Sequence, residues 1–154
     1  MTTVSIVRVA GKDRTQVTAG VRRAIAMAGG MDDVIRPGMR VMIKPNMVAP
    51  PPSAEVGACT SPLVCQAVAD VVTELGARPI IAESSARGAD TEAAYWIMGY
   101  DALRAQGYDV VDLKQDKTVR VPLADGRVLG DITTFDLVTR MDAIVSVPIL
   151  KTHD

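Results

Sequence analysis

The stretch Arg40-Val-Met-Ile-Lys-Pro-Asn46 decides the fold class, because it places a short apolar run between two breaks in the chain. Pro37-Gly38 precedes the run and is typical of a turn. Pro45 ends it, since proline cannot donate a hydrogen bond to a β-ladder. The stretch therefore predicts a strand over residues 40–44 that leads directly into polar residues.

Strands and helices alternate along the rest of the chain. Short β-branched or apolar runs predict strands, and apolar residues at intervals of three to four predict helices. The predicted strands cover residues 4–9, 40–44, 79–82, 109–113 and 143–150. The predicted helices cover residues 15–28, 61–75, 91–98, 101–105 and 135–141. This order indicates an α/β fold, with a mostly parallel sheet flanked by helices.

One β-hairpin is expected to interrupt the alternation. Residues 119–121 and 127–129 flank Asp125-Gly126, a dipeptide that favours a tight hairpin turn. The 154 residues contain no internal repeat and no linker, so they fit a single domain.

The composition excludes several classes of function. Seventeen Lys and Arg stand against eighteen Asp and Glu, the net charge is −1, and aromatic residues make up 3% of the chain. Nucleic-acid binding is not expected, because both a basic surface and stacking aromatics are lacking. No apolar run reaches the ~18 residues that a membrane span needs, and the N-terminus lacks the order of a secretory signal. We expect a soluble, cytoplasmic protein without a membrane or nucleic-acid partner.

The cysteines and the histidine limit the metal chemistry of the chain. Cys59 and Cys65 are the only cysteines, and His153 is the only histidine. They cannot by themselves form a four-cysteine iron–sulfur cluster or a multi-histidine site, so no metal site is expected. A mixed site of His153 with Glu83 or Asp154 stays open. Cys65 is expected in the core, whereas Cys59 precedes a helix and has nucleophile or ligand as its alternative role.

Polar residues follow three of the predicted strands. Ligands of open α/β sheets bind outside the carboxyl ends of the strands, so parallel strands would bring these residues to one edge. The groups are Lys44-Pro45-Asn46, Glu83-Ser84-Ser85 and Lys151-Thr152-His153-Asp154.

This edge predicts a site for a small anionic ligand, because lysines suit a carboxylate or a phosphate. The candidate catalytic residues are Glu83, His153 and Lys151, with Glu83 or His153 moving a proton. The candidate ligand-binding residues are Lys44, Asn46, Thr60, Ser61, Ser84 and Thr152. Thr60 and Ser61 are included because the helix that starts there offers free N–H groups, with simple helix capping as the alternative. A solvated surface position is the alternative for Lys44 and for Glu83.

Four motifs, taken in order, resemble the family numbered 362 among the domains of unknown function. They are Val41-Met-Ile-Lys-Pro-Asn46, Thr60-Ser-Pro62, Gly99-Tyr100 and Val147-Pro-Ile-Leu-Lys-Thr-His153. The resemblance implies a link to iron–sulfur or ferredoxin chemistry, since many members carry a cysteine-rich cluster domain. This chain has no such cysteines, so no cluster of its own is implied. The family domain continues beyond Lys-Thr-His, which implies that residues 1–154 are an incomplete copy of a longer domain.

These observations leave more than one class of function open. The first is a redox-linked enzyme that binds a small anionic ligand at the carboxyl ends of its strands. The second is a non-catalytic ligand-binding or assembly module that works with a redox partner chain. An inactive truncated fragment is the third. A homo-oligomer is also expected, because the last strand would leave an uncovered sheet edge.

Overall fold

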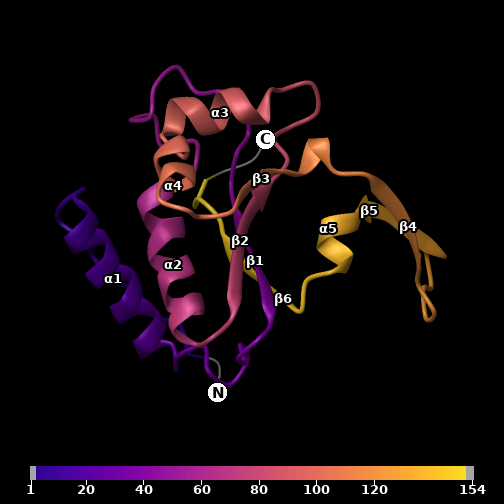
Figure 1. The fold of residues 1–154 in the computed structure, drawn as a ribbon, viewed down its shortest axis with the longest axis horizontal. Coiled ribbons are helices and arrows are strands. Elements are labelled where there is room, and N and C mark those ends of the chain that lie inside the picture. Colours follow the sequence, from indigo (N-terminus) through magenta and orange to yellow (C-terminus); the bar gives the residue numbers. More distant parts are fainter. Residues whose placement is uncertain (1–2, 152–154) are drawn as a thin grey trace.

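Four parallel strands form the central sheet of the computed structural model, which describes residues 3–151 (Figure 1). The strands lie in the order β3-β2-β1-β6 and pair in parallel throughout. Their bounds are β1 Arg40–Pro45, β2 Arg78–Glu83, β3 Val110–Asp112 and β6 Ala143–Val147. The predicted α/β class with a mostly parallel sheet is therefore confirmed.

Two helices cover one face of the sheet in successive layers. Helix α2 (Pro62–Glu74) packs on the strands, and α1 (Arg14–Met27) packs on the outside of α2 (Figure 1). Helices α3 (Thr91–Met98) and α4 (Asp101–Ala105) lie near the start of α2. Because one side of α2 carries small and β-branched apolar residues, it approaches the strands closely, and the main core forms between them.

The opposite face of the sheet carries a smaller apolar cluster. It consists of Met42, Ala82, Leu113 and Leu137. The segment above it contains a 3-10 turn (Leu113–Gln115) and helix α5 (Asp136–Thr139). Between them, β4 (Thr118–Pro122) and β5 (Asp131–Phe135) form an antiparallel hairpin that projects away from the sheet (Figure 1).

The predicted hairpin is confirmed, but its predicted tight turn is wrong. The second strand begins at Asp131 rather than at residue 127, so residues 123–130 connect the two strands. Leu123 N donates to Gly130 O at 2.9 Å, and Gly126 N donates to Leu123 O at 3.2 Å. These bonds give the longer connection a turn of its own, and Asp125-Gly126 lies within it.

The predicted strand over residues 4–9 is also wrong. No described residue pairs with this segment, which instead runs along α1. Ser5 Oγ donates to Ala24 O at 2.5 Å, and the Val9 side chain packs where Gly20 has no Cβ. The period-two pattern still appears in the burial, because Ser5 and Val7 are half-buried while Val4 and Ile6 are exposed. The backbone N–H and C=O groups of a helix are already hydrogen-bonded within the helix. Helix α1 therefore cannot form the ladder of hydrogen bonds that a neighbouring strand would offer to residues 4–9.

No helix among residues 3–151 is both long enough and apolar enough to cross a membrane.

Candidate functional site

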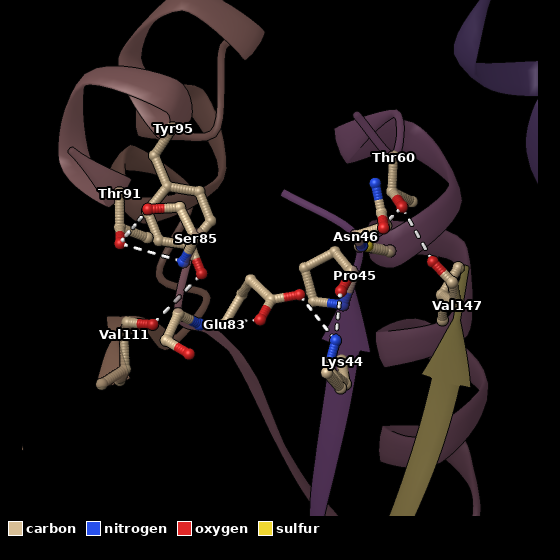
Figure 2. Close-up of polar contacts among 12 residues, drawn as sticks. Lys44, Pro45, Asn46, Thr60, Glu83, Ser85, Thr91, Tyr95, Val111 and Val147 are labelled. Carbon is tan, nitrogen blue, oxygen red and sulfur yellow. Dashed lines mark hydrogen bonds and ion pairs between the residues drawn. The ribbon is translucent and has the colours of Figure 1, made fainter. Parts of the chain in front are cut away.

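The carboxyl edge of the sheet is centred on an ion pair between adjacent strands. Lys44, at the end of β1, places its Nζ 2.7 Å from Glu83 Oε2 at the end of β2 (Figure 2). The Glu83 side chain is 6% exposed and that of Lys44 is 45% exposed. The predicted meeting of these two side chains is confirmed, since β1 and β2 are parallel neighbours.

Backbone groups fix both members of this ion pair. Glu83 Oε1 accepts a hydrogen bond from Ser84 N at 2.8 Å, and Lys44 Nζ donates to Pro45 O at 3.2 Å. The ammonium group of Lys44 has three protons. The ion pair with Glu83 Oε2 and the bond to Pro45 O use two of them. The half-exposed Lys44 therefore has a donor left for a group that approaches from solvent.

Asn46 and Thr60 are close together, and the Thr60 hydroxyl and the Asn46 side-chain nitrogen are both bonded within the protein. Asn46 N donates to Thr60 Oγ1 at 2.8 Å, and Thr60 N returns a bond to Asn46 O at 3.0 Å. Thr60 Oγ1 donates to Val147 O at 2.8 Å (Figure 2). Asn46 Nδ2 donates to Ala58 O at 2.8 Å. These bonds tie the ends of β1 and β6 to the start of α2, so both residues hold the edge together.

Ser61 lies at the start of α2 and borders an apolar cavity. It is the N-cap residue, followed by Pro62, and its side chain makes no capping bond. The cavity has a volume of about 670 Å³, and Thr60, Ser61 and Lys12 are among its polar lining residues. Lys44 and Glu83 do not line it, so the edge presents a polar centre and a separate apolar hollow.

Lys114 belongs to the same edge and was missed by the sequence analysis. Its Nζ donates to Ser85 Oγ and to Ala86 O, both at 2.9 Å, and to Ala89 O at 2.5 Å. Ser85 Oγ also lies 2.9 Å from Thr91 Oγ1 (Figure 2). Lys114 thus holds the loop that follows β2. Lys114 directly follows the predicted strand over residues 109–113. This position, which the other polar groups share, could have identified it as a residue of the edge.

Asp112 was missed as well. It ends β3 opposite Glu83 in the register, and it is buried. Its Oδ1 accepts from Lys114 N at 2.9 Å. A second buried carboxylate therefore lies at this edge, one strand away from the ion pair.

The third predicted polar group is only partly described. Lys151 is exposed beyond the end of β6. Thr152 and His153 lie outside the described residues, as does Asp154. The predicted approach of Lys151 and His153 to Lys44 and Glu83 therefore stays a prediction.

The two thiols lie in the protein interior. Burial raises the pKa of the Cys65 thiol to about 12, and Cys65 Sγ lies 3.4 Å from Tyr100 Oη. The predicted core position of Cys65 is confirmed. Cys59 is buried too, with Sγ 3.8 Å from Ala49 O. Among residues 3–151, no three Cys, His, Asp or Glu side chains are grouped in a way that could hold a metal ion.

Comparison with known proteins gives one family and one curated relative. The relative is a thylakoid-associated protein of Synechocystis sp., 29% identical over 161 residues. The match covers 97% of this chain and 45% of the relative, so the chain spans just under half of that protein's length. No solved structure matches the chain. The family model described as domain of unknown function DUF362 matches residues 41–154, and the chain therefore belongs to the DUF362 family.

Proposed function

We propose that the carboxyl edge of the sheet binds a small anionic molecule, with Lys44 as its cationic contact. The observation that carries the proposal is the ion pair of the half-exposed Lys44 with the buried Glu83 at 2.7 Å. Glu83 keeps the ammonium at the strand end, so a ligand meets a donor that is already in place. A fixed donor costs less conformational entropy on binding than a free surface lysine.

The same pair would allow Glu83 to move a proton, and we propose this role in an enzyme whose redox link rests on the family resemblance alone. A carboxylate within hydrogen-bond reach of an ammonium can exchange a proton with it or with a bound molecule. Lys151 and His153 are the further candidate catalytic residues, and Ser84 and Thr152 are further candidate ligand contacts. Two cysteines cannot ligate a four-cysteine cluster, so any iron–sulfur cluster would be held outside residues 1–154, for instance by a redox partner chain.

Titration with inorganic phosphate and with succinate, followed by backbone amide NMR shifts, tests the binding proposal. We expect shifts concentrated at Lys44 and Asn46 and in residues 83–85. Lys44→Met should abolish them, because it keeps the aliphatic stem and removes the charge. Lys117→Met is the matched control, since Lys117 is an exposed lysine beside Asp136 at the base of the hairpin. Shifts that survive in Lys44→Met, or no shifts with either anion, would reject the proposal.

An assembly module is the second candidate function. Two features support it: β6 pairs only with β1 within residues 3–151, and the curated relative is named for its association with thylakoids. A module of this kind would keep its association when Lys44 is replaced. Self-association of both the wild type and Lys44→Met in sedimentation, together with no amide shifts on anion titration, would favour the assembly module. A cytoplasmic location stays a prediction.

A further inference from the structure

Residues 84–90 form the loop that follows β2, and Lys114 holds this loop from the end of β3. Lys114 Nζ donates to Ser85 Oγ and to Ala86 O at 2.9 Å each. It also donates to Ala89 O at 2.5 Å. An ammonium group has three protons, so these three bonds engage all of them. Any part that Lys114 takes in binding a ligand is therefore indirect.

Lys114 is attached to a rigid part of the fold. It lies in the 3-10 turn Leu113–Gln115, which follows the buried Asp112. Asp112 Oδ1 accepts a hydrogen bond from Lys114 N at 2.9 Å, and Leu113 is buried in the smaller apolar cluster. The backbone of Lys114 is thus fixed by the end of β3 and by the core, which directs its side chain toward the loop.

The loop reaches the candidate anion site at its first residue. Ser84 N donates to Glu83 Oε1 at 2.8 Å, and Glu83 Oε2 lies 2.7 Å from Lys44 Nζ (Figure 2). Ala86 N donates to Val48 O at 2.8 Å, which joins the loop to the residues that follow β1. The orientation of Glu83, and with it the position of the Lys44 ammonium, therefore depends on where the loop lies.

We propose that Lys114 is a positioning residue for the anion site at Lys44, an inference that rests on the proposed function. Its ammonium keeps the loop in one conformation before a ligand arrives, so binding does not carry the entropy cost of ordering the loop. Without this ammonium, the loop gains conformational freedom and Glu83 is oriented less strictly. An anion must then order the loop and the ion pair together, and its affinity should fall.

A serine beside a lysine can also be a nucleophile with its base, but the contacts of Ser85 do not favour that role. Its hydroxyl donates to Ala89 O at 3.2 Å and therefore accepts the bond from Lys114. A lysine that donates three hydrogen bonds is charged and cannot take a proton from the serine. Ser85 is also 4% exposed. These contacts favour positioning over nucleophilic catalysis.

Phosphate titrations of two lysine variants test the proposal. In the wild type, phosphate should shift the backbone amides around Lys44. Lys114→Ala should weaken the affinity for phosphate at least about fivefold, the lower end of typical couplings between two sites, while its central strands keep wild-type amide shifts. Lys117→Ala is the matched control, since this exposed lysine lies beside Asp136. It should bind phosphate like the wild type.

Chemical rescue separates positioning from a general loss of stability. Propylammonium corresponds to the part of the side chain that Lys114→Ala removes. At saturating concentration, it should restore most of the phosphate affinity of this variant and leave the affinity of the wild type unchanged. Sodium chloride at the same ionic strength is the control and should restore nothing.

The outcomes distinguish this inference from the proposed function on which it rests. Wild-type phosphate affinity in Lys114→Ala would overturn the inference and leave the anion site at Lys44 intact. An equal loss in Lys117→Ala, or a loss that propylammonium does not relieve, would also overturn the inference. A wild type that binds neither phosphate nor succinate would overturn the proposed function, and this inference with it.

Discussion

Replacing Lys44 with methionine removes the partner of a buried carboxylate and should destabilise the fold. The variant leaves Glu83, 6% exposed, with Ser84 N as its described hydrogen-bond donor. Breaking a fully buried ion pair costs about 3–5 kcal/mol. Because the Lys44 side chain is 45% exposed, water screens the pair, and we expect a smaller loss of about 1–2 kcal/mol in the free energy of unfolding.

A double-mutant cycle identifies the origin of that loss. Glu83→Gln keeps the shape of the side chain and removes its charge. The Lys44→Met, Glu83→Gln double variant should therefore be more stable than Lys44→Met alone, since no unpaired buried charge remains. Urea denaturation followed by circular dichroism measures all four proteins, with Lys117→Met as the surface control. The reasoning is refuted if Lys44→Met matches that control within about 0.5 kcal/mol, or if the two single losses simply add.

Three further predictions concern the surroundings of the pair. Thr60→Val should lower the free energy of unfolding by about 1–3 kcal/mol, because Val147 O loses its donor and Asn46 N loses its acceptor at a buried side chain. Thr60→Ser should retain most of the stability, and equal losses in both variants would count against this role. Burial raises the pKa of Cys65 to about 12, so the unfolded state releases this proton at lower pH and stability should fall between about pH 9 and pH 12. Cys65→Ala should flatten that decline in alkaline urea titrations, and an unchanged slope would contradict it. Lys114→Met should speed amide hydrogen exchange in residues 84–90 and leave exchange in the central strands unchanged.

Much of the fold follows from local patterns in the sequence. The apolar runs that begin β1 and β2, and the helical periodicity of α2, agree with the observed elements to within a few residues. The meeting of Lys44 and Glu83 was predictable for the same reason, because parallel neighbouring strands bring their carboxyl ends to one edge. The order of the strands was not predicted, since it depends on contacts between distant segments.

The use of the polar atoms at the edge could not be predicted. Thr60 opens a helix and therefore suggested an anion site, but its hydroxyl donates to Val147 O, 87 positions further along the chain. Lys114 holds carbonyl groups of a loop 25 to 28 positions earlier. A sequence indicates which side chains can donate or accept, whereas only the folded arrangement determines which donors remain for a ligand. In this structure, that criterion favours Lys44 over Thr60 and Lys114.

The segment of residues 4–9 illustrates the difference between a strand conformation and a strand pairing. Its run of β-branched residues predicts a strand, and the burial alternates as in a strand, since Ser5 and Val7 are half-buried while Val4 and Ile6 are exposed. Pairing needs a second strand with free backbone groups, and the side of a helix has none. The segment therefore keeps the side-chain pattern of a strand without its hydrogen bonds. Among residues 3–151 no strand pairs with this segment, so a strand-like side-chain pattern does not by itself establish a place in the sheet.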